Sequence, residues 1–236
     1  MLFIKVGKRI EAGMVFDGRL YHGAQGAAGL IGQLPIGPEG QTASLESLAG
    51  SERIAKDGFR AAETRDSDML ASILARSGRI TAVDVGQSAQ MGDAVSTEII
   101  SRSGRIIGQV VATLANMLNP SLIVLSGSVA QTNDILLASV REAVYRSSHP
   151  LVTRDLRIVS SQMGNSASLV GAAAVAIERL FEAETLRSWV LYGSPLVSPA
   201  FQSALEMARK VSREDAGKSA DMDAPAPPVS MKVKDA

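Results

Sequence analysis

A long amphipathic segment, from Asp93 to Leu118, constrains the fold more than any other part of the chain. Its apolar positions recur at the spacing of one helix face: Ile99, Ile106, Val110, Leu114 and Leu118. Asn119-Pro120 ends the predicted helix, because a residue before proline disfavours the α region. The next residues, 122–125, are all apolar, which is typical of a buried strand. We therefore expect a long helix, capped by Asp93, that leads into the sheet of an α/β domain.

The first residues of the chain predict antiparallel strands. Residues 2–6 and 10–16 are the first two strands, joined by a turn at Gly7-Lys8-Arg9, and Asp17-Gly18 is a strong hairpin signal before a return strand at 19–21. Further helices are predicted over 45–55, 67–76, 134–145 and 167–181, and a further strand over 156–160. The helix over 167–181 is expected to pack in the core. Strands followed by strand–helix alternation predict a mixed sheet covered by helices.

Composition narrows the classes of function. The 236 residues carry 24 Lys and Arg against 24 Asp and Glu, so the formal net charge is zero. A nucleic-acid binder usually shows a basic excess, so no direct nucleic-acid contact is expected from this chain. With no cysteine, disulfides and thiolate metal sites are excluded. Because neither a signal peptide nor an apolar run of about 18 residues is present, we expect no membrane partner and a cytoplasmic location.

Three features could carry chemistry, and each has a plain structural alternative. Ser126-Gly127-Ser128 follows a strand and precedes a helix, as phosphate-binding turns do, or is a simple connection. The glycines at 23, 26 and 29 allow close backbone approach to a ligand, or form a loop of small residues. Glu46 accepts a hydrogen bond from a sugar hydroxyl, or is an exposed carboxylate that suits a helix start. The two histidines, His22 and His149, are interpreted as ordinary surface or packing residues.

Five stretches in this order resemble the ROK family of sugar kinases and sugar-responsive repressors. They are residues 10–20, 23–33, 45–49, 118–129 and 169–173. The resemblance implies one lobe of the actin/hexokinase-like (RNase H-like) fold, an α/β arrangement, over residues 1–182. An additional helical segment would then cover 183–213, and a Pro/Ala-rich tail over 214–236 is expected to be disordered.

The same resemblance assigns roles to individual residues. Glu46 matches a sugar-binding glutamate of the family, and Gln33 stands where the family has a histidine that touches both the sugar and a structural zinc ion. Leu30 replaces a second sugar-binding glutamate. Without that histidine and the family's cysteine cluster, no zinc is expected.

On the nucleotide side, Ser126, Gly127 and Ser128 are close to a family Gly-Gly turn. Gly7 is the one glycine retained from the Gly-Thr-Gly-Ile-Gly hairpin of the kinases, which reads Gly-Lys-Arg-Ile-Glu over residues 7–11.

No catalytic residue is predicted, because the family's catalytic aspartate stands before the position of residue 1. The favoured hypothesis is a sugar-sensing and dimerising part of a ROK-type regulator, truncated relative to the family, with its DNA-binding domain missing from this chain. An ATP- and Mg-dependent kinase of a hexose or N-acetylhexosamine, lacking its amino-terminal lobe, is the alternative. A structural remnant without function is the third possibility. A sugar ligand and a homodimer are the expected partners.

Overall fold

The structure is a computed structural model that describes residues 1–38, 42–197, 199, 201–203 and 205–206. The chain forms two compact units, Met1–Ala167 and Ser168–Ala236, and each is described by itself. The predicted tail over 214–236 lies outside the described residues. The boundary at 167/168 falls inside the range of 1–182 that the sequence indicates for the lobe.

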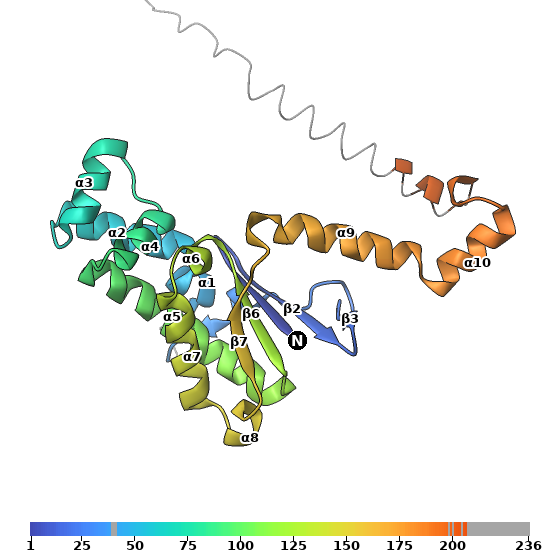
Figure 1. The fold of residues 1–236 in the computed structure, drawn as a ribbon, viewed down its shortest axis with the longest axis horizontal. Coiled ribbons are helices and arrows are strands. Elements are labelled where there is room, and N and C mark those ends of the chain that lie inside the picture. Colours follow the sequence, from blue (N-terminus) through green and yellow to red (C-terminus); the bar gives the residue numbers. More distant parts are fainter. Residues whose placement is uncertain (39–41, 198, 200, 204, 207–236) are drawn as a thin grey trace, which may run out of the picture. The chain divides into compact units, whose positions relative to one another are not determined.

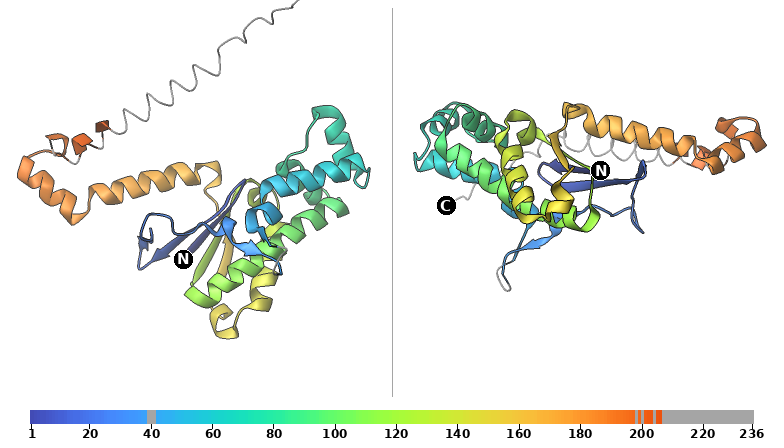
Figure 2. Two further views of the ribbon diagram at one scale, coloured as in Figure 1. Left: turned by 180° about the vertical axis from the view of Figure 1, so that it is seen from behind. Right: turned by 60° about the horizontal axis from the view of Figure 1, so that its bottom comes forward.

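A five-stranded mixed sheet is the centre of the first unit (Figures 1 and 2). Its strands, in the spatial order β3-β2-β1-β6-β7, are Arg19–Leu20, Ile10–Phe16, Leu2–Val6, Leu122–Ser126 and Arg157–Ser160. The pairs β1–β2 and β2–β3 are antiparallel, whereas β1–β6 and β6–β7 are parallel. The predicted mixed sheet and opening meander are therefore confirmed. Asp17 (φ 50°) and Gly18 (φ 76°) both adopt positive φ, as a tight hairpin turn requires.

The register of the strands places rows of apolar side chains on one face of the sheet. Leu2, Ile4 and Val6 alternate along β1 and are almost fully buried. Ile4 pairs with Leu125 of β6, and Leu2 pairs with Ile123, so the rows continue across the parallel strands. Alternate residues of a strand point to the same face of the sheet, so these side chains can form one hydrophobic cluster with buried residues of the helices of the unit.

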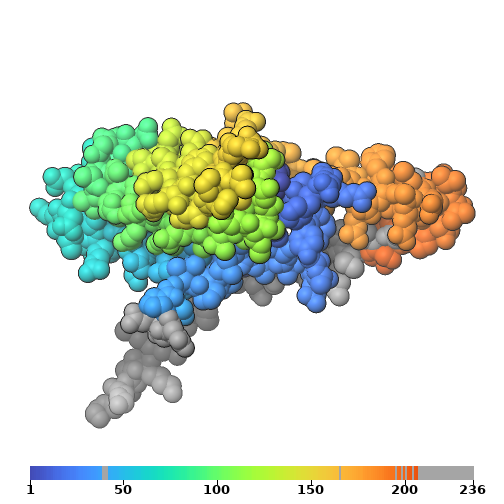
Figure 3. Space-filling model, turned by 90° about the horizontal axis from the view of Figure 1, so that it is seen from below, coloured from blue at the N-terminus to red at the C-terminus, as the bar shows by residue number. Residues whose placement is uncertain are grey.

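Helices α5 (Ala94–Leu118) and α7 (Ile135–Ser147) pack against each other and cover this face, green and yellow in Figures 1 and 3. Glycines make the close packing possible, because a Cβ at Gly104 or Gly108 would lie 2.6 Å from a Cβ of α7. Asp93 caps α5 by accepting a hydrogen bond from the Ser96 amide at 2.8 Å, as predicted. The long helix leading into β6 is thus confirmed.

Several shorter helices of this unit form a cluster beside the sheet (Figure 1), namely α1 (Leu45–Ala49), α2 (Ser51–Glu63), α3 (Asp68–Ser77), α4 (Ala82–Gln90) and α6 (Ser128–Thr132). Helix α8 (Pro150–Thr153) lies apart from them, in the connection between α7 and β7. The single helix predicted over 45–55 is wrong, since the chain bends at Gly50, which has extended backbone angles and ends α1. Before α1, a short strand, β4 (Pro35–Ile36), pairs with β5 (Ala43–Ser44).

The second unit begins after the start of α9 (Ala167–Leu180) and continues with α10 (Ala183–Tyr192) and a short turn of helix, η3, at Pro195–Val197. Helix α9 forms where the sequence predicts it, and the second unit by itself buries none of its residues, so its packing in the core stays a prediction. Leu169 and Ile177 are 75% and 55% exposed. Helical spacing of apolar residues predicts a helix, and a neighbour of sufficient area is needed to bury it. Of the helical segment predicted over 183–213, residues from 207 onward lie outside the described part.

Candidate functional site

Two turns meet at one edge of the sheet. The strands β1 and β6 are parallel, so their carboxyl ends lie at the same edge, followed by the hairpin Gly7-Lys8-Arg9 and by the turn Ser126-Gly127-Ser128. Gly127 (φ 119°) lies so close to β1 that a Cβ would be 2.0 Å from the Val6 carbonyl oxygen. Ligands of α/β proteins commonly bind at the carboxyl ends of strands. This edge is therefore the candidate position of a ligand site.

The hairpin is held against the amino-terminal end of α2. The Ser51 amide donates a hydrogen bond to the Gly7 carbonyl oxygen at 2.9 Å. The Lys8 ammonium lies 2.9 Å from a carboxylate oxygen of Glu52, and this hydrogen bond is the main reason why the pKa of Lys8 is raised. Both side chains are well exposed, so the pair orients Lys8 more than it stabilises the fold.

Glu46 stands in the first turn of α1, which Ser44 caps by accepting a hydrogen bond from the Ser47 amide at 3.3 Å. The side-chain amide of Gln33, at the end of the short helix η1 (Ile31–Gln33), donates a hydrogen bond to the Glu46 carboxylate. Between them, Gly32 has no room for a side chain, since its Cβ would lie 2.6 Å from a Glu46 carboxylate oxygen. The structure therefore brings together Gln33 and Glu46, the two predicted sugar-binding residues.

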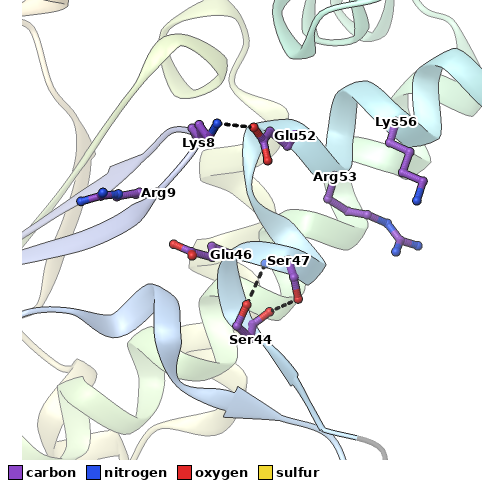
Figure 4. A pocket seen from close by; sticks show the side chains of 8 residues that line it. All are labelled: Lys8, Arg9, Ser44, Glu46, Ser47, Glu52, Arg53 and Lys56. Carbon is purple, nitrogen blue, oxygen red and sulfur yellow. Dashed lines mark hydrogen bonds and ion pairs between the residues drawn. The ribbon is translucent and has the colours of Figure 1, made fainter.

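Two hollows adjoin this pair. One of about 370 Å³ is lined by Arg9, Ile10, Glu11, Leu30, Gly32, Gln33 and Glu46. The other, of about 380 Å³, is lined by Lys8, Arg9, Ser44, Glu46, Ser47, Glu52, Arg53 and Lys56 (Figure 4). We call them the polar hollow and the basic hollow. They share Arg9 and Glu46, which extend in the same direction from the hairpin and from α1 in Figure 4.

The residues predicted on the nucleotide side have different environments. Ser126 is 3% exposed, and Gly127 packs directly against the backbone of β1. Ser128 lines a third hollow of about 300 Å³, together with residues of α2 and of the start of α4. Gly7 lies at the hairpin, beside the basic hollow. Of these four residues, Ser128 alone is among those that line the hollows described here.

Of the clustered glycines at 23, 26 and 29, Gly29 is required by close packing within the chain. Gly29 (φ 95°) lies against β2, where a Cβ would be 1.7 Å from the Ala12 carbonyl oxygen, and the Ala12 amide donates to the Gly29 carbonyl oxygen at 2.8 Å. Gly26 has open space around its Cβ position. His22 and His149 are exposed, and His149 caps α8 through its imidazole. The close approach at Gly29 is thus to a neighbouring strand.

The donor set does not fit a zinc ion. Gln33 occupies the position at which the resemblance places a histidine ligand, and its amide is hydrogen-bonded to Glu46. The sequence supplies no cysteine to complete such a site. Among the residues that the structure describes, no three His, Asp or Glu side chains are grouped so that they could hold a metal ion.

The sequence alone did not point to the contributions of α2 and of the turn before α1. Arg53 and Lys56 line the basic hollow from α2, and Ser44 and Ser47 line it from the start of α1. Arg53 is ion-paired at 2.9 Å with Asp57, which Arg102 also contacts. The signal that could have indicated this surface is a pair of basic residues three positions apart, with Arg53 inside the helix predicted over 45–55 and Lys56 just after it.

Comparison with known proteins identifies the fold and then the family. A crystal structure of a ROK family transcriptional regulator, a homologue of the E. coli MLC protein, superposes with a TM-score of 0.65 at 28% identity, over 73% of this chain and 44% of that one. A ROK family glucokinase from Streptomyces griseus superposes with a TM-score of 0.64 at 21% identity, covering 74% and 59% of the two chains, which supports the fold alone. Residues 1–179 match the ROK family. The chain belongs to this family, and the predicted family and actin/hexokinase-like fold are confirmed.

Both a sugar kinase and a transcriptional repressor are among the proteins similar to this chain in sequence. A glucokinase from Halalkalibacterium halodurans is 30% identical over 178 residues, which are 72% of this chain and 54% of that protein. The DNA-binding transcriptional repressor Mlc from Escherichia coli K12 is 24% identical over 178 residues, 73% of this chain and 43% of the repressor. The chain spans about half the length of the curated relatives it matches. In the described part of the chain, no helix has the length and apolar character needed to cross a bilayer.

Proposed function

We propose that this domain binds a sugar without phosphorylating it, as the ligand-sensing part of a ROK-type transcriptional regulator. The proposal depends chiefly on the Glu46 carboxylate. It accepts a hydrogen bond from Gln33, packs closely against Gly32 and lines the polar hollow. A carboxylate accepts hydrogen bonds from sugar hydroxyls, and an amide has both a donor and an acceptor group. The hollow falls within the size range of small-ligand sites.

The carboxylates of the polar hollow support sugar binding. Glu46 accepts a hydrogen bond from Gln33, and Glu11 lies 3.9 Å from the Arg9 guanidinium. The hydrogen bond from Gln33 orients the Glu46 carboxylate and leaves its other lone pairs free to accept hydrogen bonds from sugar hydroxyls, which is the role that the family resemblance gives this residue.

The hairpin also favours a non-catalytic role. Phosphoryl transfer depends on the positioning of the nucleotide phosphates and their metal ion. Lys8 and Arg9 place long side chains where the family's kinases have residues that let the backbone approach phosphate, and Ser126 and Gly127 are occupied by contacts within the sheet edge. The hairpin of this chain therefore does not fit a nucleoside triphosphate and its Mg²⁺ in the way that the glycine-rich hairpin of the kinases would.

The proposal extends to partners and location. A regulator of this kind would act in the cytoplasm as a homodimer and would contact DNA through a separate domain. Light scattering coupled to size-exclusion chromatography tests the dimer, and a purely monomeric chain at micromolar concentration would contradict that part of the proposal.

A sugar kinase is the second candidate, favoured by the 30% identity to a glucokinase and by the third hollow beside Ser128. Calorimetric titration with hexoses, N-acetylhexosamines and ATP-Mg, followed by a coupled assay for ADP release, separates the two. We expect sugar binding, lost in the Glu46→Ala variant, without ADP release. Phosphorylation of any of these sugars would refute the sensing proposal in favour of a kinase, and the absence of any sugar binding would leave a structural remnant.

A further inference from the structure

Leu30 differs in chemistry from the polar side chains beside it in the polar hollow. The charged and amide groups of this hollow come from Arg9, Glu11, Gln33 and Glu46. Leu30 lines the same hollow and is 56% exposed, and its side chain can neither donate nor accept a hydrogen bond. The polar hollow therefore combines hydrogen-bonding groups with an exposed apolar surface.

The backbone on both sides of Leu30 is fixed. The Gly29 carbonyl oxygen accepts hydrogen bonds from the Ala12 amide of β2 at 2.8 Å and from the Ile31 amide at 2.7 Å. Ile31, which follows Leu30, is 6% exposed and belongs to the hydrophobic core. Because both neighbours are anchored, the exposure of Leu30 is a property of a well-packed turn.

The short helix η1 places Leu30 beside Gln33. Leu30 immediately precedes this helix and Gln33 is its last residue, and the Gln33 backbone amide donates a hydrogen bond to the Leu30 carbonyl oxygen at 3.4 Å. Side chains three positions apart eclipse each other in a 3₁₀ helix. Gln33 is in turn hydrogen-bonded to Glu46. An apolar side chain and an amide–carboxylate pair therefore line one space of about 370 Å³, which is the size of a small-ligand site.

These two kinds of surface suit different parts of a ligand. Glu46 and Gln33 offer hydrogen bonds to hydroxyl groups. A hydroxyl group brought against Leu30 would lose its hydrogen bonds to water without gaining a partner, which is unfavourable. An apolar group in the same place removes hydrocarbon surface from water, which is favourable. The polar hollow therefore favours a sugar that is apolar on one side over a sugar that is hydroxylated all round.

We propose that the ligand of this domain is a sugar that carries an apolar group, with its hydroxyls at Glu46 and Gln33 and the apolar group against Leu30. The inference rests on the proposed function for the sugar half of the ligand. The apolar group can be the methyl group of a 6-deoxyhexose or the aryl group of a glycoside, since both present hydrocarbon where the free hexose presents a hydroxyl. Leu30 thus determines specificity, whereas Glu46 and Gln33 recognise the sugar.

The test is calorimetric titration of the full chain with matched ligands. Glucose, galactose and mannose are each compared with their 6-deoxy form and their phenyl glycoside, and phenol is the probe without a sugar. We expect at least one substituted sugar to bind about tenfold more tightly than its parent, as burial of part of a leucine side chain provides. Its binding should also show the more negative heat-capacity change, which reports the burial of apolar surface. The deoxy and phenyl arms distinguish the two positions of the apolar group on the sugar.

Variants of two exposed leucines separate contact at Leu30 from general hydrophobic attraction. The measured quantity is the ratio of the two affinities, substituted sugar over parent, which does not depend on how much of the protein is folded. In Leu30→Gln this ratio falls from about ten to within about twofold of one, because the apolar surface is replaced by a hydrogen-bonding group. Leu34, which is 40% exposed and follows η1, is the matched position, and Leu34→Ala keeps the wild-type ratio. An equal fall of the ratio in both variants would overturn the inference.

The outcomes also separate this inference from the proposed function. If no substituted sugar binds more tightly than its parent, the inference about the apolar group is overturned and sugar sensing stays in place. Binding of phenol as tightly as of the phenyl glycosides overturns the inference, since the sugar is then not recognised together with the apolar group. Absence of binding by every sugar and substituted sugar overturns both.

Discussion

The Gln33 side-chain amide donates a hydrogen bond to the Glu46 carboxylate, and this contact joins the end of η1 to the first turn of α1. Gly32 allows the two segments to approach, since any side chain there would collide with Glu46 and with the Ile10 carbonyl oxygen. The candidate sugar site is therefore built from two segments whose distance depends on one glycine.

Replacement of Glu46 by alanine should weaken sugar binding by about tenfold or more, because a carboxylate that accepts hydroxyl hydrogen bonds is removed. Titration calorimetry measures the loss. Glu98→Gln, which changes an exposed carboxylate on α5 paired with Arg105, is the control and should bind sugar like the wild type. If Glu46→Ala bound the sugar with unchanged affinity, Glu46 would not be a ligand-binding residue.

Gly29→Ala should destabilise the fold far more than Gly26→Ala. Both glycines have positive φ, which costs an alanine about 1 kcal/mol, but Gly29 also lies against the Ala12 carbonyl oxygen while Gly26 faces open space. We expect the free energy of unfolding to fall by about 3 kcal/mol or more in Gly29→Ala, because the added methyl group forces β2 and the segment around residue 29 apart. Urea unfolding followed by circular dichroism compares the two variants, and equal losses would contradict the close packing at Gly29.

The pKa of Lys8 should fall when Glu52 is replaced by glutamine. The hydrogen bond to Glu52 and its negative charge raise this pKa in the folded protein. Because the folded-state pKa is raised, the stabilisation by the pair is fully present below the ordinary lysine pKa of about 10.4 and is lost as the pH rises through the folded-state pKa. An NMR titration of the Lys8 side chain measures the change. The Glu98→Gln variant should leave the Lys8 pKa at its wild-type value, and an unchanged pKa in Glu52→Gln would show that the pair does not form in solution.

Asp93→Ala should lower the free energy of unfolding by about 1 kcal/mol or more. One Asp93 carboxylate oxygen accepts from the Ser96 amide at 2.8 Å, and the other accepts from the Ser67 hydroxyl at 2.9 Å, which links α5 to the start of α3. Asp134 precedes α7 without making a side-chain cap, so Asp134→Ala is the matched control. Thermal unfolding of the two variants should show a clear loss only for Asp93→Ala, and similar melting temperatures would argue against the cap.

Local patterns in the sequence were sufficient for most elements of the first unit. The helical period after Asp93, the apolar run at 122–125 and the Asp17-Gly18 turn each have a local physical cause and appear as predicted. Helix α4 was missed, although Thr81 and Asp84 form a capping box at its start, which is a readable signal. The break at Gly50 was missed because it depends on contact with the hairpin, which lies more than forty residues away.

The sequence by itself determined the family, the mixed sheet and the identity of Gln33 and Glu46 as candidate ligand residues. The tertiary structure decided that these two side chains meet, that Arg9 lines the same two hollows as Glu46, and that Arg53 and Lys56 join Lys8 around one of them. It also decided that Gly29 and Gly127 serve the packing of neighbouring strands. The physical reason is that periodicity and turn chemistry act over a few residues, whereas a site depends on which distant segments the packed core brings within a few ångströms of one another.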